Sequence, residues 1–162
     1  MPLDLEIIAQ SGDRPLPTPN EFSMPFWEAA GRHELVLQRC KRCETVRYYP
    51  RPGCPECQSR EAIWEKMSGE GTVYSFTIVS RPLTRWFAER VPIVVAIVSL
   101  VEGVRMMTNI VGMEPESVYI GMPVSVCWDD ADGGITLPNF SPAVANEDRE
   151  LNSSIGDFGG IA

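Results

Sequence analysis

The sequence contains few of the residues that enzymes use for acid–base chemistry. Its only histidine is His33, so any triad of serine, histidine and aspartate would have to include that residue. His33 follows Ala-Ala-Gly-Arg and precedes an apolar segment, which predicts a surface position near a helix end. A phosphate-binding glycine loop is also missing, because Gly69-Glu-Gly71 has no third glycine and no helical pattern after it. These absences favour a binding or accessory role.

Lysine is scarce, and positive charge is outnumbered. The two lysines are Lys41 and Lys66, and 14 basic residues face 22 acidic ones, giving a net charge of −8. Such a chain does not attract nucleic acid over long distances. The charge is uneven, however, since six of the basic residues lie between Arg39 and Arg60 with only two acidic ones among them.

Long hydrophobic runs are missing as well. The longest is Ile93 to Val101, interrupted only by Ser99, and it is too short to span a bilayer. The first residues, Met-Pro-Leu-Asp-Leu-Glu, show neither a basic segment nor an apolar stretch typical of a secretory signal. We therefore expect a cytoplasmic protein.

Four of the five cysteines form two Cys-x-x-Cys pairs ten residues apart, at Cys40, Cys43, Cys54 and Cys57. Two such turns facing each other offer four sulfur ligands in the tetrahedral arrangement that Zn²⁺ accepts. Four protein ligands leave no open coordination position, so the predicted zinc is structural rather than catalytic. Two disulfides would require an oxidising compartment, and a redox pair would not explain two copies so close together.

The basic residues around these cysteines allow two interpretations. Four thiolates leave a zinc site with a charge of −2, which nearby arginines offset. The same cationic surface could instead bind phosphate. Both interpretations remain open from the sequence.

The N-terminal third predicts an arm and a helix. Pro15, Pro17 and Pro19 disfavour helix near the start. Helical spacing then follows from Asn20, with Asn20 or Ser23 as the cap and with an apolar set made of Phe22, Phe26, Trp27, Ala30 and Leu35. We expect residues 1–34 to form an arm and a docking helix.

Residues 35–67 predict a rubredoxin-like zinc ribbon. Leu35 to Cys40 has the pattern of a strand entering the first cysteine pair, and Thr45 to Tyr49 that of a strand leaving it. Glu61 to Met67 leads out of the second pair, with Trp64 available to cover the metal site.

Residues 68–142 predict an all-β barrel. Five short β-rich segments are separated by turn signals: Thr72–Val79, Ile93–Val101, Val104–Val111, Val124–Trp128 and Ile135–Phe140. This number of strands suits a five-stranded OB-fold. Residues 143–162 have the composition of an extended tail, which we expect to lie on another chain.

Cys127 and the aspartates that follow it have structural rather than functional interpretations. Cys127 alternates with apolar residues in a strand, where a free cysteine behaves as a small apolar side chain rather than a nucleophile. Asp129, Asp130 and Asp132 are interpreted as a hairpin turn.

An ordered series of motifs resembles a known family. It runs through Pro25-Phe-Trp27, Leu35-x-x-x-x-Cys-x-x-Cys43, Tyr49-Pro-Arg-Pro52, Cys54-Pro-x-Cys57, Gly69-x-Gly-Thr-Val-Tyr-Ser-Phe-Thr77, Pro92-Ile-Val-Val-Ala-Ile-Val-x-Leu100, Glu102-Gly103, Gly121-Met-Pro-Val124 and Phe140-x-Pro142. Over residues 22–142 the chain resembles the acyl-CoA-associated OB-fold and zinc-ribbon proteins, domain-of-unknown-function family thirty-five. One departure is Ser141, which stands where the family usually has a basic residue.

The resemblance implies an N-terminal helical segment, a zinc ribbon and an OB-fold, in a mainly β chain. It also implies a non-catalytic accessory subunit of a two-component thiolase-like enzyme, which helps to bind acyl-CoA while the partner performs thiolysis, retro-aldol cleavage or acyl transfer. The common dimeric state of such partners suggests two copies of each chain. The alternatives are an accessory subunit of a hot-dog-fold enoyl-CoA hydratase, or a nucleic-acid-binding module.

Coenzyme A carries phosphates and an adenine, which arginines clamp and stack on. The predicted contacts on the ribbon are Arg39, Arg42, Arg47 and Arg51. In the loop between the first two barrel strands they are Arg81, Arg85 and Trp86. Self-packing of that loop explains its large apolar groups equally well.

Overall fold

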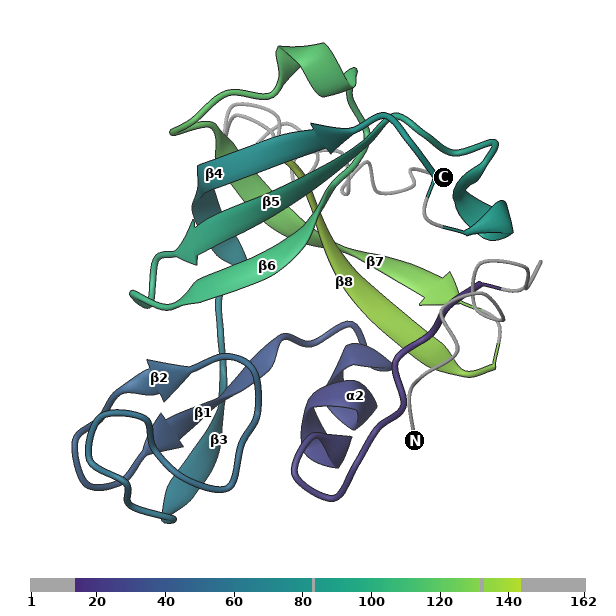
Figure 1. Ribbon diagram of the computed structural model, residues 1–162. Coiled ribbons are helices and arrows are strands. Elements are labelled where there is room, and N and C mark those ends of the chain that lie inside the picture. The colour runs from purple at the N-terminus through teal and green to yellow at the C-terminus, as the bar shows by residue number, and fades with distance from the viewer. Residues whose placement is uncertain (1–13, 83, 132, 144–162) are drawn as a thin grey trace, which may run out of the picture.

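The fold is mainly β, as the sequence predicts. The computed structural model describes residues 14–82, 84–131 and 133–143, and the expected position of the C-terminal tail on another chain falls outside them. Within these ranges, one short helix precedes a three-stranded sheet and a closed barrel of five strands (Figure 1). Among the described residues, no helix combines the length and the apolar content that crossing a bilayer requires.

Helix α2 (Met24–Ala30) begins after Ser23 and has a proline in its first turn. The side chain of Asn20 accepts hydrogen bonds from the backbone N–H groups of Phe22 and Ser23, at 3.1 and 3.0 Å. Leu35, which we placed on the helical pattern, lies beyond the helix and is buried at the entrance to the ribbon. A helix of seven residues has little stability of its own and depends on packing.

Three strands, β1 (Val36–Cys40), β2 (Val46–Arg47) and β3 (Ala62–Lys66), form the ribbon sheet in the order β2-β1-β3. Both neighbours of β1 run antiparallel to it. Strand β2 is shorter than the segment expected to leave the first cysteine pair.

An aromatic cluster joins α2 to the ribbon. The ring of Phe26, buried to 1% exposure, lies 6.0 Å from that of Tyr48 and 5.9 Å from that of Tyr49. Trp27 donates its indole N–H to the Tyr49 hydroxyl at 2.9 Å. Burial, with the proximity of Tyr49 as a second cause, raises the pKa of Tyr48 to about 12. These ring contacts and the hydrogen bond between Trp27 and Tyr49 supply the packing that the short helix needs.

The barrel contains β4 (Glu70–Val79), β5 (Ile93–Leu100), β6 (Arg105–Ile110), β7 (Pro123–Ala131) and β8 (Ile135–Pro142), in the closed order β4-β5-β6-β8-β7. Short 3₁₀ turns lie in two connections, η1 (Arg85–Phe87) and η2 (Pro115–Ser117). The five-stranded barrel predicted from the sequence is confirmed. Its closure between β6 and β8 rests on one parallel pair, Ile110 with Phe140.

The acidic residues predicted to form a turn belong instead to strand β7. Asp129 pairs with Leu137 and Asp130 with Thr136 across the β7–β8 hairpin. Arg14 donates two hydrogen bonds to the Asp129 carboxylate, one at 3.1 Å, and this interaction lowers the pKa of Asp129. The ion pair with Arg14 stabilises the charged Asp129 side chain within β7, so the strand continues to Ala131. Asp132 lies outside the described residues.

His33 connects the segment after α2 to the same hairpin. Its ring stacks on Trp128 with centroids 5.6 Å apart and an interplanar angle of 3°. Its Nε2 lies 3.1 Å from an Asp130 carboxylate oxygen, which also accepts a hydrogen bond from the Thr136 hydroxyl at 2.7 Å. Hydrogen bonding to Thr136 and then to His33 lowers the pKa of Asp130. As expected, His33 is exposed near a helix end.

Gly71 lies where β4 pairs with both β5 and β7, and we expect Gly71→Ala to destabilise the barrel by about 1–3 kcal/mol. A Cβ atom there would lie 2.6 Å from the Ser99 carbonyl oxygen and 2.7 Å from a methyl group of Val98. Urea unfolding measures the effect. Gly53→Ala is the matched control, because a Cβ at Gly53 would meet nothing within 4 Å. Equal midpoints for the two variants would contradict the predicted clash.

Candidate functional site

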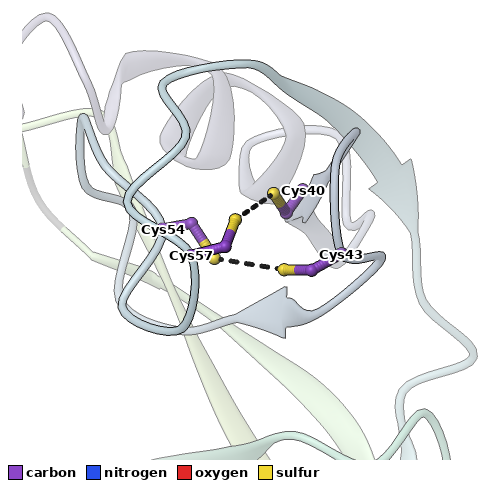
Figure 2. A group of neighbouring side chains, drawn as sticks. All are labelled: Cys40, Cys43, Cys54 and Cys57. Atoms are coloured by element: carbon purple, nitrogen blue, oxygen red, sulfur yellow. Dashed lines mark hydrogen bonds between the residues drawn. The ribbon is translucent and has the colours of Figure 1, made fainter.

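The four ribbon cysteines converge on one point. Their sulfur atoms all lie within 4.8 Å of one another. The Cys40 and Cys57 sulfurs are 3.6 Å apart, and those of Cys43 and Cys54 are 3.5 Å apart, so each contact joins one pair to the other (Figure 2).

The two cysteine turns share one backbone geometry despite different sequences. In the first, the N–H of Glu44 donates to the Cys40 carbonyl at 3.0 Å, and in the second the N–H of Gln58 donates to the Cys54 carbonyl at 2.9 Å. Glu44 and Gln58 each follow the second cysteine and have φ values of 61° and 59°. This left-handed residue returns the chain after each pair, so the two turns face each other as equivalent ligand pairs.

Backbone N–H groups favour the thiolate form at the first cysteine of each turn. Hydrogen bonds from the N–H groups of Cys43 and then Arg42 lower the pKa of Cys40 to about 6, against the opposing effect of burial. Those of Cys57 and then Glu56 lower the pKa of Cys54. At Cys57 the N–H of Ser59 acts in the same direction, but burial and the three neighbouring cysteines outweigh it and raise the pKa to about 12. The opposite pKa shifts of Cys40 and Cys57, whose sulfurs are 3.6 Å apart, are those expected of neighbouring thiols that would repel each other if both ionised.

This donor set fits a structural zinc ion. Zinc–sulfur bonds of about 2.3 Å in a tetrahedron place sulfurs about 3.8 Å apart, close to the two shortest separations here. Cys40 and Cys54 are buried, whereas Cys43 is exposed, so the cluster lies at the edge of the ribbon. An ion held by all four sulfurs would have no position for substrate, and it would stabilise the fold of the ribbon.

Two of the four predicted ribbon arginines are engaged within the fold. Arg39 forms an ion pair with Glu65, with one hydrogen bond of 3.0 Å, and donates to the Glu44 carbonyl at 2.8 Å. Arg47 is only 3% exposed and donates to the Gln38 side chain at 2.8 Å. The sequence alone could not show that Arg47 lies on the buried side of its short strand.

The other two ribbon arginines face solvent. Arg42 is exposed between the first two cysteines. Arg51 is exposed as well, and its side chain donates a long hydrogen bond of 3.4 Å to the Tyr49 carbonyl. Both guanidinium groups therefore remain accessible to an anion.

The loop between β4 and β5 holds the remaining predicted contacts and one residue that the sequence did not indicate. Arg81 and Arg85 are exposed, and Trp86 is half-buried. The Trp86 ring lies 3.9 Å from the guanidinium carbon of Arg90 and 4.8 Å from that of Arg14. Spacing of four residues between Trp86 and Arg90 was the available signal for this cation–π contact.

A cavity of about 530 Å³ opens beside this loop. It is mainly apolar, with Trp86, Phe87, Ile93, Met113 and Leu137 among its lining residues, and Arg14 and Arg90 contribute charge. Its size falls within the range of small-molecule sites. Residues of both the loop and the barrel line the cavity, and within the loop Trp86 and Phe87 also pack edge-on with ring centroids 4.9 Å apart.

Neither residue considered for independent catalysis lies in a catalytic arrangement within the described part of the chain. His33 is occupied by Trp128 and Asp130. Cys127 lies half-buried on β7 opposite Asn139, and burial raises the pKa of its thiol. A raised pKa disfavours the thiolate that a nucleophile requires.

Comparisons with family models match most of the described chain. A model described as "ChsH2, rubredoxin-like zinc ribbon domain" matches residues 27–62, and one described as "ChsH2, C-terminal OB-fold domain" matches residues 64–129. The boundary between the two models falls within β3, and together they cover the ribbon and most of the OB-fold.

Two similar proteins illustrate the relationship. The chain is 43% identical over 135 residues to a probable enoyl-CoA hydratase alpha subunit of Thermomonospora curvata, covering 83% of this chain but only 42% of that relative's length. It is 38% identical over 109 residues to a DUF35 domain-containing scaffold protein of Methanocaldococcus jannaschii, covering 64% of this chain and 77% of the relative.

A solved structure named Ltp2-ChsH2(DUF35) aldolase is similar in both sequence and fold. The identity is 43% and the TM-score 0.72, and the match covers 80% of this chain and all of the compared chain. The order of helix, ribbon and barrel is therefore shared with an experimentally determined relative.

Proposed function

This chain belongs to the ChsH2 (DUF35) family of zinc-ribbon and OB-fold proteins, and on that premise we propose that it is the accessory subunit of a two-component enzyme acting on acyl-CoA thioesters. In this proposal the partner is thiolase-like, supplies the catalytic residues and forms or cleaves a carbon–carbon bond. The accessory chain helps to bind acyl-CoA and stabilises the complex, in a cytoplasmic assembly of two copies of each chain.

The observation that carries the proposal is the closed character of the metal site. All four ligand positions come from cysteine, so an ion there stabilises structure and leaves chemistry to another chain. Support also comes from the names of similar proteins, which describe a hydratase subunit, a scaffold protein and an aldolase. Each of these names is compatible with a subunit that works beside a catalytic partner.

Four exposed arginines are the proposed contacts for the phosphates of coenzyme A. They are Arg42 and Arg51 on the ribbon and Arg81 and Arg85 in the β4–β5 loop. Arg39 is left out because Glu65 pairs with its guanidinium group, and Arg47 is left out because it is only 3% exposed and donates through Nε to Gln38. Trp86 is retained as a neighbour of the acyl-CoA, since it lines the apolar cavity beside the loop.

A second candidate is an accessory role beside a hot-dog-fold enoyl-CoA hydratase. The 43% identity to a probable enoyl-CoA hydratase alpha subunit favours it. A nucleic-acid-binding role is disfavoured by the net charge of −8. The two acyl-CoA roles differ in the partner's reaction, so the same purified complex distinguishes them.

The direct experiment is purification of the tagged chain from its native host, followed by identification of any stoichiometric partner. The complex and the separated chains are then assayed with acyl-CoA thioesters for cleavage and with enoyl-CoA for hydration. We expect turnover by the complex and none by the isolated accessory chain. Turnover by the isolated chain would overturn the accessory role, and a complex without acyl-CoA activity would overturn the substrate class.

We expect Arg42→Glu to weaken acyl-CoA binding to the complex about tenfold or more, because one charge-assisted contact to phosphate is replaced by repulsion. Isothermal titration of the assembled complex with acyl-CoA measures the change. Arg60→Glu is the matched control, since Arg60 is also exposed on the ribbon but is not a proposed contact. Equal losses in both variants would indicate a general charge effect rather than a specific contact.

A further inference from the structure

The outward side of the β4-β5-β6 sheet has exposed apolar side chains at its centre. Strand β5 buries Val94, Ala96 and Val98 inside the barrel, yet its opposite side carries Ile93, Val95 and Ile97. A strand at the surface normally alternates apolar with polar residues, whereas a strand covered on both faces is apolar throughout. The sequence of β5 is therefore typical of a strand that is covered on both sides.

The strand register makes this face continuous. Ile97 pairs with Met107 on β6 and with Ser75 on β4, and Tyr74 projects from the bulge beside Ser75. Met107 is 67% exposed, Tyr74 48% and Ile97 37%. We use the name outer face for the outward residues on the rows Thr72–Ser99–Arg105 and Ser75–Ile97–Met107, with Tyr74 in the bulge between them.

Arg105 is the single charged residue in this set. Its guanidinium carbon lies 3.5 Å from the centre of the Tyr74 ring. The nearest acidic position along β4 is Glu70, which lies beyond the Thr72 row at the edge of the barrel. On a chain with a net charge of −8, the outer face is thus an apolar surface with one fixed cation.

The loop before β7 extends this surface. The N–H of Gly121 donates to the Val73 carbonyl at 2.7 Å, which places the loop beside Tyr74. Tyr119 and Ile120, just before it, are 57% and 70% exposed. The sheet and this extension together cover less than the roughly 800 Å² that each partner buries in a standard-size interface, so other surfaces of the chain would also contribute.

Charge complementarity identifies the occupant. A second copy of the outer face would offer Arg105 no carboxylate, because Arg105 is the single charged residue on that face. Single-stranded nucleic acid would require several cations and stacking rings, whereas the face offers one arginine and one tyrosine. A protein surface with an apolar centre and a carboxylate opposite Arg105 would cover the exposed apolar side chains and would also pair with the single cation.

We propose that the outer face, with Tyr119 and Ile120 as its extension, is the surface that docks the catalytic chain. This inference rests on the proposed function for the existence of that chain. It assigns docking to the barrel, in addition to any contacts that the ribbon and α2 make. Met107, Ile97 and Tyr74 form its apolar centre, and Arg105 pairs with an acidic residue of the partner at its edge.

Met107→Glu tests the apolar centre. We expect the variant to bind the purified catalytic chain at least a hundredfold more weakly by isothermal titration calorimetry. Val101→Glu is the matched control, because Val101 is also 67% exposed but lies in the β5–β6 turn, and its affinity should remain within threefold of wild type. A second variant, Arg105→Glu, should lose at least tenfold in affinity and reverse the salt dependence of association.

The outcomes separate this inference from the proposed function. A functional two-component complex that Met107→Glu forms with unchanged affinity would overturn the docking surface and leave the accessory role intact. If no acyl-CoA-processing chain associates with the wild-type protein, the accessory role fails and the docking proposal fails with it. A wild-type dimer in light-scattering measurements that Met107→Glu converts to a monomer would identify a second copy as the occupant and overturn the proposal.

Discussion

Replacing Cys54 with serine is expected to abolish tight zinc binding and to unfold the ribbon. The Cys54 sulfur is buried and lies 3.5 Å from that of Cys43, so serine removes one of four thiolates and leaves a polar hydroxyl in its place. Structural zinc contributes roughly 10–16 kcal/mol of binding free energy in small domains, and that energy is coupled to folding. The effect should exceed that of any single side-chain truncation in the barrel.

Metal content and folding are measured together. Elemental analysis of the wild-type protein should give one zinc per chain, and cobalt substitution should give the visible absorption of a tetrahedral thiolate site. Cys127→Ser is the matched control, because Cys127 lies on β7 outside the cluster. A Cys54→Ser protein with a full equivalent of zinc and an unchanged melting temperature would refute the four-cysteine site.

Phe26→Ala is expected to lower the free energy of unfolding by about 3–5 kcal/mol. The side chain is 1% exposed and contacts the rings of Trp27, Tyr48 and Tyr49 at centroid distances of 4.9 to 6.0 Å. Because α2 has only seven residues, the loss of this anchor should release the helix before the barrel unfolds.

Urea unfolding followed by tryptophan fluorescence measures the loss, since Trp27 belongs to the cluster. Phe22→Ala provides the comparison, because Phe22 precedes the helix and is 41% exposed. Truncation there should cost well under 1 kcal/mol. Similar costs at the two positions would mean that the aromatic cluster does not hold the helix.

The features that the sequence predicts well depend on local patterns. The cysteine spacing locates all four ligands, because each pair needs only one tight turn. The five barrel strands follow from β-branched runs separated by glycine turns, and all five are confirmed. Family motifs added the association with acyl-CoA enzymes, which composition alone does not contain.

The sequence predicts poorly the positions of side chains whose partners lie on another strand or segment. Asp129 and Asp130 have turn composition, but Arg14 and Thr136 stabilise them within a strand. Arg47 lies in a basic cluster, yet its strand position directs it to Gln38 in the interior. Arg14 lies 115 positions from Asp129 in the sequence, while Thr136 and Gln38, six and nine positions from their partners, become neighbours only when the strands pair.

Arg90 was also not identified from the sequence as a cation–π partner of Trp86. It packs on Trp86 inside a loop with no regular period, and Arg14 approaches the same ring from the N-terminal arm. The four-residue spacing of Trp86 and Arg90 is a signal only where a helical turn is expected, whereas the contact of Arg14 with the same ring depends on the three-dimensional fold alone. In the sequence, Met107 is one apolar residue of a predicted strand. Only the strand register shows that it lies beside Ile97 on the outward side of the sheet.

The single parallel pair between β6 and β8 has a kinetic consequence. The β4-β5-β6 meander and the β7-β8 hairpin are each paired along their length. Between them, β6 and β8 share one paired position, Ile110 with Phe140, with two further hydrogen bonds from Val111 and Thr108, and β4 and β7 share three residue pairs. Such a barrel consists of two cooperative units, and amide protons at the β6–β8 seam should exchange through a low-energy opening that leaves both units folded. The cavity includes Asn109, Ile110 and Asn139 at this seam, so its volume can change without global unfolding.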